Sequence, residues 1–205
     1  MIVREGYPVE THTVITEDCY ILEMHRIPHG KDEDGTEEVQ RPAVYLQHGL
    51  LCSSADWVMG SSDNSLGFLL ADAGYDVWLG NYRGNTYSRG HCSLQPKERA
   101  FWQFSWDEMG KYDIPAMIDK VLDVSKQNKT FYIGHSMGTT GFMVMANDRP
   151  EYQDKIVMAS LLAPVAFVDH MKSPIRYLAP YSNSIAVNII YTKSFLKLNH
   201  NIISL

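Results

Sequence analysis

The chain has 205 residues, with 18 Lys and Arg against 24 Asp and Glu, so its formal charge is −6 when the histidines are neutral. This length predicts one domain, or two small ones. A hydrophobic share of 45% and a charged share of 20% are ordinary for globular proteins and exclude a disordered or fibrous chain. A mildly acidic chain without a basic stripe is a poor nucleic-acid binder.

No targeting or membrane-spanning segment is visible. Residues 1–5 (MIVRE) contain no apolar core of a signal peptide. The uncharged run Ile156–Val168 falls short of the roughly 20 residues that cross a bilayer. We expect either a cytosolic protein or one whose targeting segment lies outside this chain.

The cysteines Cys19, Cys52 and Cys92 form no CxxC pair and no Cys/His cluster at zinc spacing. We therefore expect three free, mostly buried thiols and no metal, and the redox compartment stays open. The acidic run Lys31–Glu38 is typical of a solvated loop.

Strand-like and helix-like segments follow one another along the chain. Strands are predicted at Cys19–Ile27, Pro42–Gln47, Tyr75–Leu79, Thr130–Gly134 and Ile156–Leu162. Helices are predicted at Asn64–Ala73, Tyr112–Lys126 and Met137–Asp148, with Gly74 as a stop and Pro115 near a first turn. This alternation predicts an α/β fold with a mostly parallel sheet and helices on both faces. After Ala163 no further strand–turn–helix unit appears.

The strongest chemical signal is the motif G-x-S-x-G at residues 134–138, with an apolar strand before it and a helix pattern after it. A nucleophile on such a sharp turn has a strained backbone, and glycines let the two limbs of the turn pass closely. We predict that Ser136 is the nucleophile and that the Met137 N–H points to a developing oxyanion. Chance alone also produces this motif, so an incidental Gly-rich turn is the alternative.

A second signal, His48-Gly49-Leu50, directly follows a predicted strand. An oxyanion hole in this architecture needs a second N–H from the loop after an early strand, and Leu50 is the natural donor. The alternative is an ordinary His-Gly turn. We expect His48 to be a structural hydrogen-bonding group rather than a base.

A serine nucleophile also needs a general base and an orienting carboxylate, which in this fold follow the serine in the order acid, then histidine. After Ser136 the histidines are His170 and His200, and the acids are Asp148, Glu151, Asp154 and Asp169. None stands at the end of an apolar strand in that order, so His170 and His200 are weak candidates. His135 is expected to pack or bond locally.

Five segments carry a family resemblance: GHSMG, LQHGLLCSSADWV, LADAGYDVWLGNYRGNTYSRGH, FWQFSWDEMGKYDIPAMID and GYPVETHTVITEDCYILEMHRIPHG. They resemble the acid lipases of the gastric and lysosomal type, and the resemblance covers nearly the whole chain. These lipases are α/β-hydrolases that cleave triacylglycerols and cholesteryl esters. The resemblance implies Ser136 as nucleophile and the Leu50 and Met137 amides as the oxyanion hole.

The resemblance also implies a location and a domain division. It implies a secreted or lysosomal protein that is N-glycosylated, with Asn128 of Asn128-Lys129-Thr130 as the candidate. Residues 1–164 would form the N-terminal part of the hydrolase core, and residues 165–205 the incomplete start of the lid.

Three departures separate this chain from that family. Mammalian members have Gln where this chain has Met137, and relatives have Gly where this chain has Cys19. The chain also ends at Leu205, within the expected lid, so we expect an N-terminal half without its triad Asp and His.

The leading hypothesis is a lipase acting on neutral lipid esters at a lipid–water interface, without a cofactor. The alternatives are a catalytically silent fragment or lipid-binding remnant, and a serine thioesterase or peptidase of the same fold. We expect the 205-residue chain alone to hydrolyse esters poorly or not at all.

Overall fold

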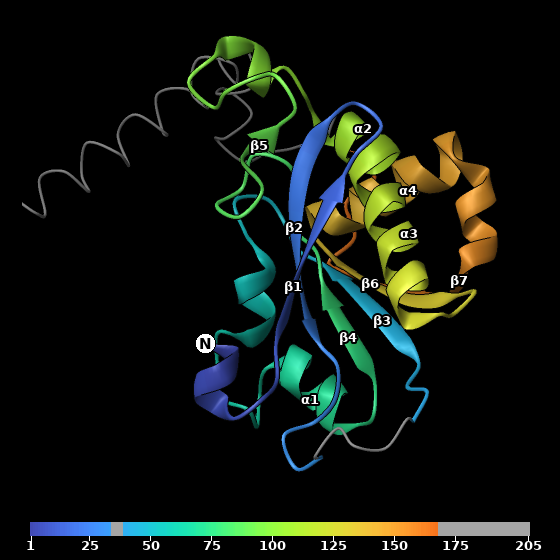
Figure 1. Cartoon of the computed structure of the whole chain (residues 1–205). Helices are drawn as coiled ribbons and strands as arrows, with labels where there is room; N and C mark the ends of the chain where they lie inside the picture. Colours follow the sequence, from blue (N-terminus) through green and yellow to red (C-terminus); the bar gives the residue numbers. More distant parts are fainter. Residues whose placement is uncertain (34–38, 168–205) are drawn as a thin grey trace, which may run out of the picture.

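The computed structural model describes residues 1–33 and 39–167, which form one mixed sheet flanked by helices (Figure 1). The strands are β1 (Glu10–Ile15), β2 (Tyr20–Ile27), β3 (Ala43–Gln47), β4 (Asp76–Leu79), β5 (Gly90–His91), β6 (Thr130–His135) and β7 (Ile156–Leu162). The helices are α1 (Leu66–Asp72), α2 (Trp106–Glu108), α3 (Ile114–Ser125) and α4 (Met137–Asp148). Short 3-10 turns cover Ile2–Glu5, Ser54–Val58, Arg99–Trp102 and Pro150–Lys155.

The sheet has the strand order β1-β2-β4-β3-β6-β7, and β5 pairs with β2 outside this row. Strands β4, β3, β6 and β7 run parallel, whereas β1, β2 and β5 add antiparallel pairs. The predicted α/β fold is confirmed, and each predicted strand and helix is present. The sequence does not predict strand β1, because only Val14 of its six residues is buried.

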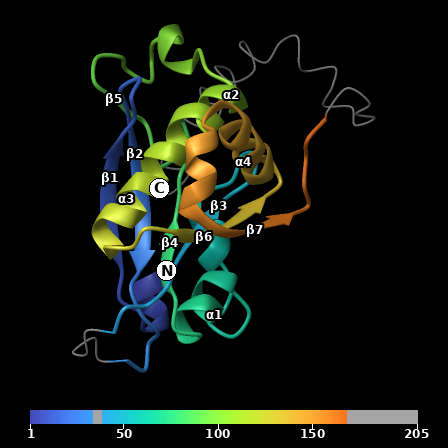
Figure 2. The same cartoon turned by 90° about the vertical axis from the view of Figure 1, so that its right-hand side faces the viewer.

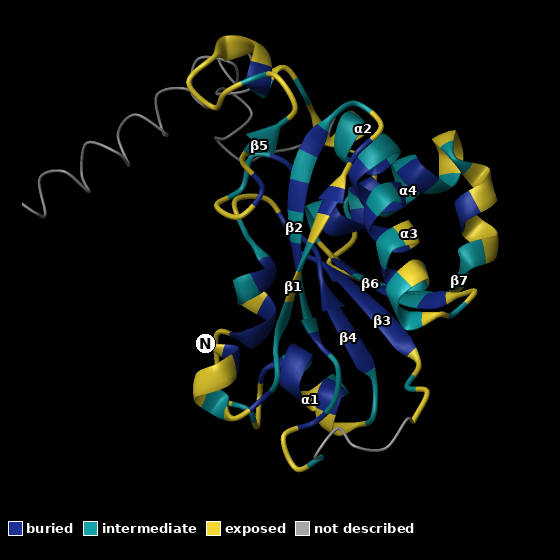
Figure 3. Cartoon of the chain, viewed as in Figure 1, coloured by how far each residue is buried: buried dark blue, intermediate teal, exposed yellow. Residues whose placement is uncertain are grey.

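Both faces of the central strands are buried, as Figure 3 shows for β3 and β4. In β3, Val44 and Leu46 pack with α1 in one core, while Ala43 and Tyr45 pack with α3 in the other. Figure 2 shows α1 on the opposite side of the sheet from α3 and α4. Successive side chains of a strand point to opposite faces of the sheet, so each central strand contributes to both cores.

The helix predicted at Tyr112–Lys126 begins earlier than expected. Ser105 and Glu108 form a capping box that starts α2, and a π-helical turn, Met109–Asp113, joins α2 to α3. Pro115 has no N–H for the Lys111 carbonyl, which instead accepts a hydrogen bond from Arg149. The missing bond explains why the helix widens at this point.

Most of the predicted lid segment, 165–205, lies outside the described residues, as do Asp169, His170 and His200. Among the residues that are described, no helix is long and apolar enough to cross a membrane.

Candidate functional site

Ser136 lies between the end of β6 and the first residue of α4, where the sequence predicts it. Its backbone has φ 51° and ψ −115°, a conformation that favours glycine and is costly for a serine. The Ser136 N–H donates to the Leu162 carbonyl at 2.9 Å, and the Ser136 carbonyl accepts from the Thr139 N–H and hydroxyl. The strained turn is therefore held from both sides.

The two glycines of the motif allow the close packing that the sequence predicts. A β-carbon on Gly138 would lie 2.4 Å from the Gln47 carbonyl oxygen, and one on Gly134 would lie 2.8 Å from the Gly138 carbonyl oxygen. Both distances are too short for real atoms. Glycine is thus required for α4 to leave β6 so steeply against the end of β3.

The His48–Leu51 loop lies against this turn. A β-carbon on Gly49 would be 3.2 Å from the Ser136 Cβ, so the Gly49 backbone contacts the serine. The Gly49 carbonyl accepts hydrogen bonds from the His48 ring at 2.8 Å and from the Cys52 N–H at 3.3 Å. Because the N–H and C=O of a trans peptide point in opposite directions, these bonds aim the Leu50 N–H away from His48.

His48 is buried, and burial lowers its pKa to about 4. Its Nε2 accepts the Tyr82 N–H at 3.2 Å, so the neutral ring carries its proton on Nδ1 and donates it to the Gly49 carbonyl. Both nitrogens are occupied. His48 therefore holds the loop and cannot serve as the base, as its sequence context predicts.

A pocket of about 300 Å³ opens beside the turn. Its lining residues come from the His48–Cys52 loop, from the segment 82–109 and from Met137. Its apolar lining comes from Leu50, Leu51, Trp102, Phe104, Met109 and Met137. Leu51 is 86% exposed, with φ 60°. The pocket could therefore take an apolar group next to Met137, the residue that follows the nucleophile.

Trp102 and Phe104 were not singled out from the sequence. They lie in one of the segments that carry the resemblance, but the sequence assigns no role to either. They reach the pocket because the long loop after β4 folds back over Gly84, whose absent side chain leaves room for both rings.

Within the described residues, no hydrogen bond joins the Ser136 hydroxyl to a histidine. His135 is exposed, and the acids Asp148, Glu151 and Asp154 lie at the end of α4 and in the following 3-10 turn, away from the elbow. The candidate bases His170 and His200 are outside the described residues.

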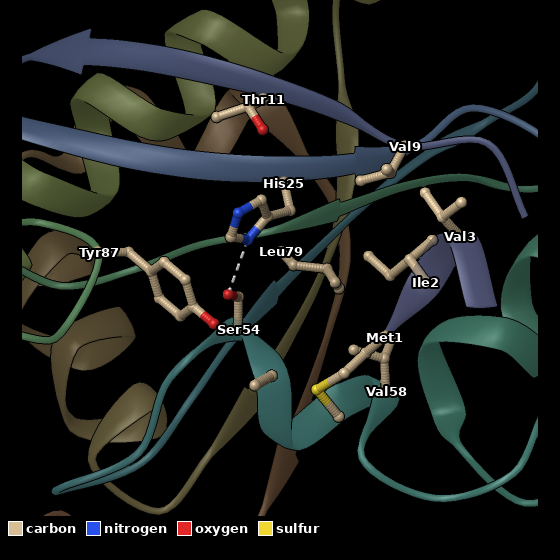
Figure 4. Close-up of a pocket in the computed structure, with 11 residues that line it drawn as sticks. Met1, Ile2, Val3, Val9, Thr11, His25, Ser54, Val58, Leu79 and Tyr87 are labelled. Atoms are coloured by element: carbon tan, nitrogen blue, oxygen red, sulfur yellow. Dashed lines mark hydrogen bonds between the residues drawn. The ribbon is translucent and has the colours of Figure 1, made fainter. Parts of the chain in front are cut away.

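A second pocket contains a different serine–histidine pair (Figure 4). The His25 Nδ1 lies 2.9 Å from the Ser54 hydroxyl, and its Nε2 lies 3.1 Å from a Glu23 oxygen. However, Ser54 is only 1% exposed and its oxygen already accepts a hydrogen bond from Asn81. The Ser54 hydroxyl is therefore a poor candidate nucleophile, and the His25–Ser54 hydrogen bond ties β2 to the turn that contains Ser54.

The cysteines differ from the expectation of mostly buried thiols. Cys92 is exposed, while Cys19 and Cys52 are half-buried. The cause is the position of Cys92, which directly follows the two-residue strand β5 in a surface loop. No cluster of three metal-binding side chains occurs among the described residues.

Comparison with known proteins gives two family matches. The family described as "Partial alpha/beta-hydrolase lipase region" matches residues 1–61, and the family described as "alpha/beta hydrolase fold" matches residues 42–188.

Several named lipases are similar in sequence. Lipase member K of Mus musculus is 50% identical over 186 residues, which are 91% of this chain and 46% of that protein. Gastric triacylglycerol lipase of Bos taurus is 51% identical over 179 residues, 87% of this chain and 45% of that protein. Lipase 3 of Drosophila melanogaster is 52% identical over 180 residues, with 87% and 45% covered. The chain thus spans a little under half the length of these relatives.

A solved structure supports the fold independently. An esterase of Pyrococcus furiosus aligns with 92% of this chain and 66% of its own, with a TM-score of 0.61 at 17% identity. Together with the strand order and the turn at Ser136, these matches show that the chain belongs to the α/β-hydrolase fold family.

Proposed function

We propose that this chain carries the nucleophile and the oxyanion hole of a lipase that cleaves neutral lipid esters. The observation that carries the proposal is Ser136, held at positive φ between β6 and α4 with the Gly49 backbone packed against it. The apolar pocket and the relatives named as lipases support the substrate class.

In the proposed reaction the Ser136 oxygen attacks the ester carbonyl and the hydroxyl proton passes to a histidine. The carbonyl oxygen becomes an oxyanion, which the Leu50 and Met137 N–H groups stabilise. The Leu50 N–H donates to no acceptor among the described residues. The alcohol leaves with a proton, and water then releases the fatty acid from the acyl-serine. The histidine that accepts this proton would be His170, His200 or one in a longer form of the protein.

The domain division and location remain part of the proposal. Residues 1–164 would form the core and residues 165–205 would begin a lid over the pocket. The protein would work at a lipid–water interface after secretion or delivery to lysosomes.

Asn128 lies on an exposed bend between α3 and β6, accessible to a glycan. Because the Thr130 hydroxyl is buried and donates to the Ala43 carbonyl, Asn128→Gln is the variant that tests this site cleanly.

A catalytically silent lipid-binding protein is the second candidate. It is favoured by one observation, the absence of any described histidine on the Ser136 hydroxyl. The two candidates differ in turnover and not in binding, since the apolar pocket serves both.

The test is hydrolysis of a long-chain triacylglycerol emulsion at acidic and neutral pH. It compares the 205-residue chain with a form extended to the relatives' length. We expect turnover by the extended form, and Ser136→Ala to lower it at least about a thousandfold. Ser93→Ala, an exposed serine in the loop after β5, is the matched control. Retention of labelled lipid without turnover by either form would instead establish the silent candidate.

A further inference from the structure

Cys19 and Cys92 lie one position beyond the end of the short β2–β5 ladder. In that ladder Tyr20 pairs with His91 and Ile21 pairs with Gly90, so the next position brings the two cysteines together. The Cys92 N–H donates to the Cys19 carbonyl at 3.0 Å, which continues the pairing. The two residues are 73 positions apart in the sequence, and their meeting is a product of the fold.

The backbone of Cys19 is strained. Its φ of 73° lies in the left-handed region that favours glycine, and its N–H donates to the Thr16 carbonyl at 2.9 Å to close the turn before β2. The neighbouring Cys92 side chain is the leading cause that raises the pKa of the Cys19 thiol. Both thiols are free in the structure, so the backbone pairing carries the geometric argument.

We propose that Cys19 and Cys92 form a disulfide bond that fastens the loop after β4 to the start of β2. Directly paired residues of an antiparallel ladder have Cα atoms about 4.5–5.5 Å apart, and disulfides bridge Cα separations of about 4.4–6.8 Å. The pair thus needs no large backbone movement.

Oxidation requires an external disulfide, for which glutathione disulfide is a suitable class. The exposed Cys92 thiolate attacks it, forms a mixed disulfide and releases one glutathione thiolate. The Cys19 thiolate then attacks the Cys92 sulfur, which releases the second glutathione thiolate and leaves the Cys19–Cys92 bond. Cys52 lies outside this ladder, in the loop after β3, and burial raises its pKa to about 11, so we expect it to stay reduced.

The bond would stabilise one wall of the pocket beside Ser136. The loop between β4 and α2 supplies Arg89, Trp102 and Phe104 to that wall, yet its only strand is the two-residue β5. Residues 92 and 93 and 95–100 of this loop are exposed. A covalent link at Cys92 limits the opening of a segment that few backbone bonds hold.

The first experiment is a peptide map of the full chain after equilibration with glutathione disulfide at pH 8, alkylation under denaturing conditions and trypsin digestion without reductant. Trypsin places Cys19, Cys52 and Cys92 on separate peptides, 5–26, 32–83 and 90–97. We expect peptide 5–26 to be linked to 90–97, with Cys52 alkylated. Alkylation of both Cys19 and Cys92, or a link to Cys52, would overturn the proposal.

The second experiment tests the stapling role through the thermal midpoint with and without dithiothreitol. Loss of a disulfide with a typical stabilising effect lowers the thermal midpoint of a chain of this length by roughly 5–15 °C. We expect such a fall for the wild type and for Cys52→Ser. Cys19→Gly, which relieves the backbone strain and so protects folding, is expected to show no response to reductant. An unresponsive wild type that carries the link would refute the stapling role.

Discussion

Arg83 lies fully buried between two carboxylates. Its Nε donates to Asp113 at 2.7 Å, its backbone N–H donates to the same carboxylate at 2.9 Å, and its Nη2 donates to Asp18 at 2.9 Å. The guanidinium also lies 4.0 Å above the Tyr20 ring. Burial raises the pKa of Asp113 to about 6, against the opposing effect of Arg83. This cluster joins the turn before β2, the loop after β4 and the π-helical turn.

Asp113→Asn is expected to lower the free energy of unfolding by about 3 kcal/mol, because removing one partner leaves the Arg83 charge buried and incompletely paired. Urea unfolding at pH 7.5 measures this loss. Glu17→Gln is the control, since that carboxylate pairs with Arg149 at 3.1 Å on an exposed surface and should change stability by less than about 1 kcal/mol. If both variants lose the same free energy of unfolding, breaking the buried Asp113–Arg83 pair costs no more than breaking the exposed Glu17–Arg149 pair.

At the scale of elements, the packing of α4 on the end of β3 fixes the elbow. Gly138→Ala places a methyl group against the Gln47 carbonyl, a backbone atom that cannot move without disturbing β3. We expect a loss of about 1–3 kcal/mol in urea unfolding despite the higher helix propensity of alanine. Asn147→Ala, on the exposed part of the same helix, should stay within about 0.5 kcal/mol. A stabilised Gly138→Ala variant would contradict the close contact.

The elements that the sequence predicts well are those with strong local signals. The buried strands β3, β4 and β6 and the turn at residues 134–138 are each encoded in a short stretch of sequence. Their predicted and observed bounds therefore agree within about two residues. Strand β1 lacks such a signal because Glu10–Ile15 buries one side chain, and only its pairing with β2 makes it a strand.

The features that the sequence does not reveal depend on contacts between distant segments. Trp102 and Phe104 reach the pocket, and Cys92 reaches Cys19, through a loop whose course no local pattern defines.

At the scale of the whole molecule, buried titratable groups give its stability a pH dependence. The pKa of His48 is lowered to about 4 by burial, against about 6.5 in the unfolded chain. As pH falls from about 6.5 to about 4, the unfolded state binds a proton that folded His48 refuses, so stability falls. Asp113 acts in the opposite direction, because its raised pKa lets the folded state bind a proton as pH falls through about 6.

The His48 contribution can be isolated with His48→Gln. The variant is expected to be less stable than the wild type at pH 7, because it loses the bond that the ring accepts from the Tyr82 N–H. When the pH falls from 7 to 4, the variant should lose less stability than the wild type. The difference between their free energies of unfolding should shrink by up to roughly 3 kcal/mol. Urea unfolding across this range measures the difference, and parallel curves would show that His48 does not titrate as inferred.

Strand β3, in the interior of the sheet, has a consequence for synthesis on the ribosome. The Ala43 carbonyl accepts a hydrogen bond from Thr130, 87 residues later in the chain. At a translation rate of about 5–20 residues per second, β6 emerges roughly 4 to 17 s after β3. Until then one edge of β3, with Val44 and Leu46, lacks its native strand partner. The nascent chain therefore exposes a short β-branched and aromatic segment of the kind that chaperones bind, for longer than most local folding events take.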